Sequence, residues 1–341
     1  MKAAILEQLK KPLVVADVAI PDTLVSGQVR VRMLSAGLCG SQLHEIDGNR
    51  GEDKYLPHLL GHEGSGIVKE TGPDVKKVKK GDYVVISWIK GSGINAPGAT
   101  YSWGKKKVNS GSAAVFAEEI IASENRITKI SKKIPHDVAA LLGCAVPTGA
   151  GVVRNTLNIP KGSTIAIFGV GGVGTSAIMG AVLMGAKEII AVDIAPEKLK
   201  LAKKLGATMI VNASQKDPVA VIRKKYKDGV DCAVEAAGIT SVMEQAFASL
   251  SNTGTLGIAG HPKEGSKISL NPFEFILGKK IVGSWGGGTN PDKDIPYYAK
   301  QYLQGTLPVE KLVTHRFQLD DINDAVNALR SGNAARVVIS F

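Results

Sequence analysis

Cysteine is scarce in this sequence, and the few cysteines present are not arranged in pairs. The 341 residues include three of them, Cys39, Cys144 and Cys232. An odd and widely spaced set excludes the disulfide framework of a small secreted protein. The first residues also lack the charged leader, apolar core and cleavage site of a secretory signal. We therefore expect a cytoplasmic protein whose cysteines are free to act as metal ligands.

A membrane-spanning run is missing as well. Residues 165–186 form a stretch of 22 positions without a charge, which is long enough to raise the question. Glycines interrupt its first half at Gly169, Gly171, Gly172 and Gly174. A buried strand, a turn and a helix explain the stretch better than a membrane helix does, so we expect no membrane partner.

Acidic residues are outnumbered by basic ones. The chain has 42 Lys and Arg against 31 Asp and Glu, a formal net charge of +11, so nucleic acid must be considered as a partner. The basic residues occur in short scattered groups, such as 76–80, 105–107 and 223–225. We expect no nucleic-acid partner, and keep a non-catalytic nucleotide- or polyanion-binding protein as the alternative from a different class.

The length of the chain and the change in its pattern predict two domains. Up to about residue 134 the apolar segments are short and separated by Gly and Pro, which favours a barrel-like antiparallel module. Its expected strands lie at 3–6, 13–18, 28–33, 66–70, 81–86, 114–116 and 119–122.

From residue 161 to residue 284 strands alternate with helices, which predicts a doubly wound parallel sheet and an α/β fold class. The expected strands lie at 165–168, 188–193, 209–211, 230–235, 255–259 and 280–284. Three consecutive glycines, Gly286–Gly288, are expected to form a hinge. The segment that follows them is expected to return to the first domain. The predicted domains are a catalytic domain at 1–148, a nucleotide-binding domain at 149–285 and a returning catalytic part at 286–341.

Gly169, Gly171 and Gly174 stand at G-x-G-x-x-G spacing between an apolar strand and an expected helix. This spacing permits a tight turn, close approach of the backbone to a pyrophosphate, and packing of the helix on the strand. The free N–H groups at the helix start, around Gly172 and Val173, would then bind the anion. The sequence therefore predicts a dinucleotide site.

Asp193 ends the second strand of this region, 19 residues after Gly174. A carboxylate at this offset holds the adenosine ribose hydroxyls, which predicts NAD rather than NADP. A 2′-phosphate about 4 Å from Asp193 would be repelled by about 4 kcal/mol at an effective dielectric of about 20. The alternative for Asp193 is a strand end or a helix cap before Pro196. Lys198 either reaches the same ribose or is solvated.

Cys39, His62 and Cys144 form a candidate metal set. Two cysteines and one histidine suit Zn²⁺ with three protein ligands and one open position, the arrangement of catalytic zinc. Their separations of 23 and 82 residues are too long for a local pattern to prove a site. From the residues alone, Cys39 and Cys144 could equally be small buried hydrophobes, and His62 a turn histidine.

Several motifs in order show that the sequence resembles the zinc-dependent medium-chain alcohol dehydrogenase family over essentially its whole length. The matching segments are 60–68, 78–85, Gly143-Cys144, the glycine fingerprint with Asp193, Gly206-Ala207 and 332–336. The resemblance implies a GroES-like β-barrel catalytic domain and a Rossmann NAD-binding domain. It further implies that Cys39, His62 and Cys144 bind one catalytic zinc per chain, with Glu63 close behind as a supporting or exchanging ligand.

The resemblance also implies roles for other positions. Ser41 matches the hydroxyl that binds the substrate oxygen, and His44 matches the end of a proton relay to solvent. Thr148 matches a residue beside the nicotinamide, and Arg336 an arginine that pairs with the cofactor pyrophosphate. Two alternatives stay open: His44 as a solvated loop histidine, and Glu63 as a structural residue.

The implied reaction is hydride transfer between NAD and a small-molecule substrate. The substrate would be a primary or secondary alcohol or a polyol, interconverted with its aldehyde or ketone. Zinc would act as a Lewis acid, because a free alcohol is too weak an acid at neutral pH to give up hydride readily. The closest rival is a zinc-free NAD(P)H reductase of the same superfamily. Family members are usually homodimers or homotetramers.

The sequence departs from the family at two places. Many members hold a structural zinc with four cysteines after the strand that ends near residue 86, whereas residues 88–113 contain no cysteine; we expect no structural zinc. This loop opens with Trp88, our candidate for a residue that lines the substrate pocket, and ordinary core is the alternative. Gln42 stands where an aspartate usually orients the ligating histidine, which is expected to weaken metal binding or shift activity.

Overall fold

The structure, a computed structural model, describes residues 1–332 and 334–341. Asn333, which belongs to the 332–336 motif, lies outside the described residues. The chain divides into two compact units: unit 1 comprises 1–144, 290–305 and 313–341, and unit 2 comprises 145–289 and 306–312. The tail is therefore divided, unlike the single returning part 286–341 of the prediction. Val309 and Leu312 are fully buried, and their segment contacts helix α4 (Gly172–Leu183) of unit 2, which explains the difference.

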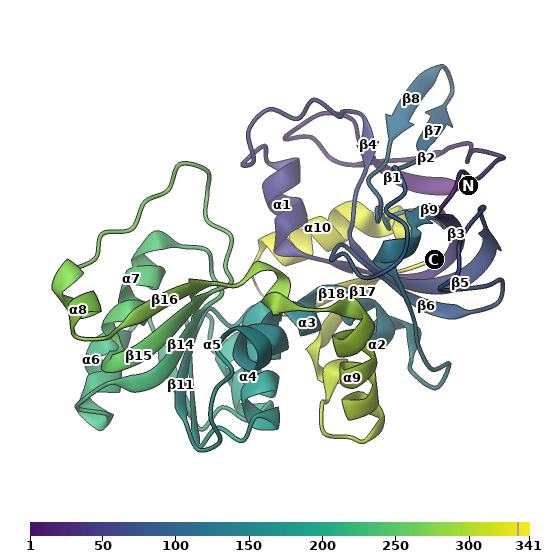
Figure 1. Cartoon of the computed structure of the whole chain (residues 1–341). Coiled ribbons are helices and arrows are strands. Elements are labelled where there is room, and N and C mark those ends of the chain that lie inside the picture. Colours follow the sequence, from purple (N-terminus) through teal and green to yellow (C-terminus); the bar gives the residue numbers. More distant parts are fainter. Residues whose placement is uncertain (333) are drawn as a thin grey trace. The chain divides into compact units, whose positions relative to one another are not determined.

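Two sheets form the frame of unit 1 (Figure 1). The first, in spatial order, consists of β2 (Val14–Asp17), β1 (Lys2–Leu6), β4 (His58–Leu59), β8 (Lys106–Asn109) and β7 (Thr100–Trp103). The second consists of β10 (Ile127–Lys129), β6 (Tyr83–Ser87), β5 (Glu63–Thr71), β3 (Gln28–Leu38), β18 (Arg336–Ser340) and β17 (Val313–Gln318), with β9 (Glu119–Ser123) paired to β3. The chain's last strand, β18, runs antiparallel to β3 and so places Arg336 beside the end of that strand.

The expected strand at 114–116 was wrong. Both Val115 and Phe116 donate their N–H groups to the single carbonyl of Leu60, and Ala4 donates to the carbonyl of Phe116. The segment is apolar because its side chains are buried in the core, but its backbone bonds do not form a ladder. A buried segment that does not pair with a neighbouring strand can therefore have the same apolar sequence pattern as a strand.

Helices α1 (Gly40–Ile46), α2 (His136–Leu141), α9 (Pro291–Leu303) and α10 (Ile322–Arg330) belong to unit 1. Helix α10 buries Ile322, Ala325 and Val326, which share one face because their spacing of three and four residues matches the helical repeat. Asn290 caps α9 by accepting the N–H of Asp292 at 3.1 Å. Helix α1 is short, and it begins directly after Cys39.

Unit 2 contains one parallel sheet with helices packed against it (Figure 1). Its order is β13 (Met209–Asn212), β12 (Glu188–Asp193), β11 (Thr164–Phe168), β14 (Val230–Glu235), β15 (Leu250–Ile258) and β16 (Lys280–Gly283). The order reverses between β11 and β14, as in doubly wound nucleotide-binding sheets. The remaining helices of this unit are α3 (Ala145–Gly151), α5 (Pro196–Lys204), α6 (Pro218–Lys225), α7 (Thr240–Ala248) and α8 (Pro272–Ile276).

The side chains of Ile165 to Phe168 in β11 are fully buried, because a parallel sheet covered on both faces requires apolar residues at every position. The predicted α/β class with a doubly wound parallel sheet is confirmed. Among the described residues, no helix is both long enough and apolar enough to cross a membrane.

Candidate metal centre and cofactor site

Three candidate ligands from distant parts of the sequence meet in unit 1. Cys39 lies between β3 and α1, His62 directly precedes β5, and Cys144 directly precedes α3. Their ligand atoms all lie within 4.8 Å of one another, and His62 Nε2 is 3.2 Å from Cys144 Sγ. Two sulfurs and one imidazole nitrogen at this separation are a donor set that fits Zn²⁺.

The two thiols act as a pair. The hydrogen bond between them lowers the pKa of Cys39 well below its ordinary value and raises the pKa of Cys144 well above it. The positive charge of Arg336 further favours the Cys39 thiolate. A thiolate is the form that binds metal, and these contacts favour the thiolate at Cys39 while they keep the proton on Cys144.

A buried ion pair lies beside these ligands. Glu63 Oε1 and Arg336 Nη2 form a close contact, and both side chains are almost fully buried, with exposed fractions of 0% and 3%. Burial alone lowers the pKa of Arg336, but Glu63 and the two cysteines raise it, so the guanidinium stays charged. The structure thus places Arg336 against Glu63, and the expected contacts of Arg336 with a pyrophosphate and of Glu63 with zinc stay predictions.

Glycines make room for the Glu63 side chain. A Cβ atom at Gly37 would collide with the Glu63 carboxylate, and one at Gly143 would lie 3.0 Å from Glu63 Cβ. These two glycines flank the motifs that contain Cys39 and Cys144, and they are the sequence signal for a large buried group between those motifs. The partner of the Glu63 carboxylate, Arg336, is 273 positions away in the sequence, and no local pattern predicts their pairing.

Helix α1 carries Ser41, expected to bind the substrate oxygen, and His44, the expected end of the proton relay. Ser41 Oγ is buried, and it has no hydrogen-bond partner among the described residues. A buried hydroxyl without a partner is uncommon and calls for a ligand or water. His44 lies one helical turn later and is partly exposed. The roles of both residues remain predictions.

Trp88 lies against the candidate ligands. Its indole Nε1 donates a hydrogen bond to Cys144 Sγ at 3.2 Å, and its ring meets that of His62 edge to face at 6.4 Å between centroids. A partly exposed Trp88 fits the predicted pocket residue, but its direct contact with a ligand sulfur was not anticipated. An N–H donated to a sulfur ligand reduces the electron density that this sulfur offers a metal.

Gln42, the departure from the family noted in the sequence, contacts His62 directly. The side-chain amide is buried, with an exposed fraction of 1%. Its oxygen accepts the N–H of Cys39 at 2.9 Å, and its nitrogen lies 2.5 Å from His62 Nδ1. One amide therefore contacts both the residue of the first candidate ligand and the ring of the second.

The glycine turn of unit 2 has the geometry expected for a dinucleotide site. Gly169 has a φ of +84°, which only glycine adopts freely. A Cβ at Gly174 would collide with the Gly169 carbonyl, whereas a Cβ at Gly171 would meet nothing within 4 Å. The open side of Gly171, next to the N-terminus of the 12-residue helix α4, is where a pyrophosphate would fit. Gly172 and Val173 supply the first turn of that helix.

Asp193 joins the turn to the end of β12. Its carboxylate accepts the N–H of Val170 at 2.7 Å and that of Ala195 at 2.9 Å. The carboxylate does not cap α5, whose N-cap residue is Ala195 with no side-chain cap hydrogen bond. It is instead a group fixed beside the glycine turn, with lone pairs left for hydrogen bonds from ribose hydroxyls. Lys198 lies partly exposed on α5, and Thr148 is buried on α3; their cofactor contacts stay predictions.

A second group of metal-type side chains was missed by the sequence analysis. Glu45, Asp53 and His58 have ligand atoms within 4.8 Å of one another. His58 Nε2 is 2.9 Å from Asp53 Oδ2, and its Nδ1 is 3.0 Å from the carbonyl of Leu59. These contacts account for both nitrogens of the ring as hydrogen-bonding groups. The spacing of the three residues gives no recognisable signal.

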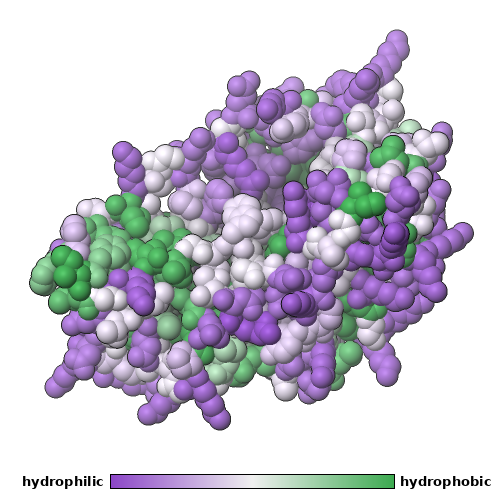
Figure 2. All heavy atoms as spheres, viewed as in Figure 1, coloured by the Kyte–Doolittle hydropathy of each residue, from purple (hydrophilic) through white to green (hydrophobic). Residues whose placement is uncertain are grey.

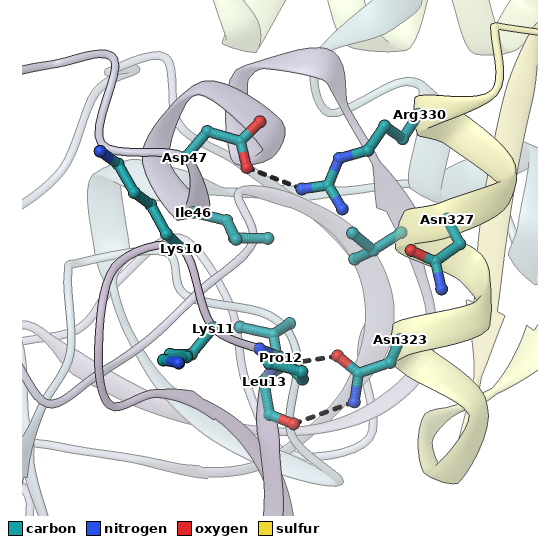
Figure 3. Close-up of a pocket in the computed structure, with 10 residues that line it drawn as sticks. Lys10, Lys11, Pro12, Leu13, Ile46, Asp47, Asn323, Asn327 and Arg330 are labelled. Atoms are coloured by element: carbon teal, nitrogen blue, oxygen red, sulfur yellow. Dashed lines mark hydrogen bonds and ion pairs between the residues drawn. The ribbon is translucent and has the colours of Figure 1, made fainter.

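A cavity of about 380 Å³ lies elsewhere in unit 1, between α10 and the loop after β1. Figure 3 shows Asp47 paired with Arg330 across it, and Asn323 bonded to the backbone of Leu13. Its lining residues are Lys10, Lys11, Pro12, Leu13, Ile46, Asp47, Asn323, Val326, Asn327 and Arg330. None of these ten is a residue that the sequence marked for catalysis, cofactor or metal.

Comparison with known proteins supplies independent findings. Residues 25–132 match the family described as "Alcohol dehydrogenase GroES-like domain", and residues 172–302 match "Zinc-binding dehydrogenase". A class-3 alcohol dehydrogenase of Zea mays is 32% identical, covering 100% of this chain and 96% of that protein.

Two solved structures extend the likeness to three dimensions. An alcohol dehydrogenase zinc-binding domain protein from Burkholderia ambifaria is 32% identical with a TM-score of 0.93, covering 100% of this chain and 98% of that chain. Benzyl alcohol dehydrogenase from Acinetobacter calcoaceticus is 30% identical with a TM-score of 0.92, covering 100% and 99%. The likeness spans both units and every candidate residue.

Proposed function

The chain belongs to the zinc-dependent medium-chain alcohol dehydrogenase family, and from that premise we propose that Cys39, His62 and Cys144 hold the catalytic zinc of an NAD-dependent oxidoreductase. The observation that carries the proposal is that the ligand atoms of these three side chains lie within 4.8 Å of one another; the hydroxyl of Ser41, two residues after Cys39, is buried without a hydrogen-bond partner among the described residues. The substrate is a primary or secondary alcohol or a polyol, interconverted with its aldehyde or ketone.

Zinc, when bound, supplies the Lewis acidity that brings an alcohol oxygen close to alkoxide. The protein supplies the proton path and the positioning. Ser41 Oγ would accept the substrate's proton while it passes its own hydroxyl proton towards the imidazole of His44. Glu63 and Arg336 neutralise each other, so neither leaves a lone buried charge beside the ligands.

NAD, when bound, supplies the hydride acceptor. The first turn of α4 would hold its pyrophosphate at the open face of Gly171, and the Asp193 carboxylate would accept hydrogen bonds from the ribose hydroxyls. Because the N–H groups of Val170 and Ala195 already hold the Asp193 carboxylate, it cannot easily change rotamer to avoid the 2′-phosphate of NADP. The support for NAD over NADP is this fixed negative charge.

A homo-oligomer is the proposed assembly. The strand β16 lies at the edge of its sheet, and the adjacent helix α8 exposes Phe273, Phe275, Ile276 and Leu277. Figure 2 shows hydrophobic residues, in green, gathered where Figure 1 draws α8. An exposed apolar patch beside the open side of an edge strand is a typical interface with a second copy. The proposed location is the cytoplasm, supported by three free cysteines.

The test of the function is an NAD-coupled assay over alcohols and polyols with three proteins: the parent, Ser41→Ala and Ser41→Thr. Loss of a positioned proton-transfer group costs about 10²- to 10⁴-fold in rate, so we expect Ser41→Ala to lose at least 10²-fold in kcat. Ser41→Thr keeps a hydroxyl and should retain most of the activity. Equal rates for the parent and Ser41→Ala would contradict the assigned proton path.

A further inference from the structure

Gln42 imposes a hydrogen-bond polarity on His62 that opposes metal binding. The amide has one accepting end and one donating end. Its oxygen is committed to the backbone N–H of Cys39 at 2.9 Å, because a backbone N–H only donates. The NH₂ group therefore faces His62 Nδ1 at 2.5 Å.

That polarity fixes the tautomer of the imidazole. An NH₂ group cannot accept, so His62 Nδ1 must carry the lone pair and Nε2 the proton. The proton on Nε2 points to Cys144 Sγ, 3.2 Å away, where the sulfur accepts it. The arrangement is complete and internally satisfied as hydrogen bonds alone.

Metal binding needs the opposite tautomer. His62 Nε2 faces the other two ligands, so it is the nitrogen that must offer its lone pair, and the proton must then move to Nδ1. An Nδ1–H would face the NH₂ of Gln42, donor against donor. Flipping the Gln42 amide relieves that contact but places its NH₂ against the N–H of Cys39. Two donors then face each other at Cys39 instead of at His62.

We propose that Gln42 is a positioning residue that weakens zinc binding at His62, so that this protein exchanges its metal more readily than the same chain with a carboxylate at position 42. A glutamate there accepts from both Cys39 N–H and His62 Nδ1–H, and so fits the metal-binding tautomer without conflict. The inference rests on the proposed function, because it takes Cys39, His62 and Cys144 as the zinc site. Changes in the groups that hold a ligating histidine alter metal affinity about 10- to 100-fold.

The first test is a competition titration of metal-free protein with Zn²⁺ against a chromophoric chelator. The proteins are the parent, Gln42→Glu and Gln8→Glu, the last adding the same charge at an exposed residue of the same unit. We expect Gln42→Glu to bind zinc about 10- to 100-fold more tightly than the parent, and Gln8→Glu to match the parent. Equal affinity of the parent and Gln42→Glu overturns the proposal while leaving the zinc site intact.

The second test reads the tautomer without any metal. Nitrogen-15 NMR of metal-free, histidine-labelled parent protein, assigned by comparison with His62→Asn, reports which ring nitrogen of His62 carries the proton. We expect the proton on Nε2, and a proton on Nδ1 overturns the inference even if Gln42→Glu fails to fold. If neither the parent nor Gln42→Glu binds zinc at all, the proposed function fails instead.

Discussion

A buried carboxylate holds the loop that follows Trp88, and removing its charge should loosen that loop measurably. Glu124 has an exposed fraction of 2%. Its Oε1 accepts the N–H groups of Lys76 and Lys77 at 2.6 and 2.8 Å, and its Oε2 accepts the N–H of Ile94 at 2.7 Å. Three backbone donors converge on one charge, and one of them, the N–H of Ile94, belongs to the 88–113 loop, whose residues include no cysteine to hold a metal.

The change Glu124→Gln replaces one accepting oxygen with a donor. The NH₂ should take the Ile94 side, because that choice loses one hydrogen bond where the other side loses two. A buried N–H left without a partner, together with the loss of charge, costs about 2–3 kcal/mol. Since each 1.4 kcal/mol is a factor of ten, the Ile94 amide should exchange with solvent about 30- to 150-fold faster.

Native-state hydrogen exchange measured by mass spectrometry over residues 88–99 checks this prediction. Glu119→Gln is the matched control, because Glu119 pairs with the half-exposed Lys69 and such surface pairs contribute about 0–1 kcal/mol. Unchanged exchange at Ile94 in Glu124→Gln would refute the idea that this carboxylate holds the loop.

The effect should also depend on pH with a definite sign. Burial alone raises the pKa of Glu124, but the N–H groups of Ile94, Lys77 and Lys76 outweigh it and lower the pKa below 4.5. A lowered pKa in the folded state means that the carboxylate's contribution is fully present above about pH 4.5 and is lost as the pH falls through the folded value. The difference between the parent and Glu124→Gln should therefore shrink under acidic conditions.

Two further predictions concern the cofactor and the assembly. Asp193→Asn removes a charge while keeping one accepting oxygen. The ratio of kcat/KM for NAD to kcat/KM for NADP should therefore fall more than tenfold. An unchanged ratio would show that Asp193 does not set the preference for NAD over NADP. Phe275→Asp places a charge in the exposed apolar patch of α8, and analytical ultracentrifugation should show a smaller species for this variant than for the parent. Ile210→Asp, at an exposed residue outside the patch, is the control. A parent that sediments as a monomer contradicts the proposed interface.

Local patterns were sufficient wherever the structure is built from neighbours in sequence. The spacing of Gly169, Gly171 and Gly174 predicted the turn, because each glycine has a separate steric reason to be there. The strand of 188–193 and its terminal Asp193 followed from the same alternation of apolar strands and helices. In each case the physical cause lies within about 25 residues of the chain.

Contacts between distant segments could not be predicted in this way. The sequence marked Cys39, His62 and Cys144 as metal-type residues, and a family resemblance, not their spacing, joined them. The pairing of Arg336 with Glu63 and the hydrogen bond from Trp88 to Cys144 depend on how β18, β5 and β6 are arranged in one sheet. The partners of such side chains can be predicted only when the register of the sheet is known.

The most direct test of the account is the zinc content of the purified protein, measured by elemental analysis beside Cys39→Ser. We expect one zinc per chain in the metal-replete parent, and loss of that zinc in Cys39→Ser, with circular dichroism showing that the fold is retained. Two zincs per chain would contradict the absence of a structural site in the 88–113 loop. No zinc in the parent under metal-replete conditions would contradict the central claim that Cys39, His62 and Cys144 form a catalytic metal centre.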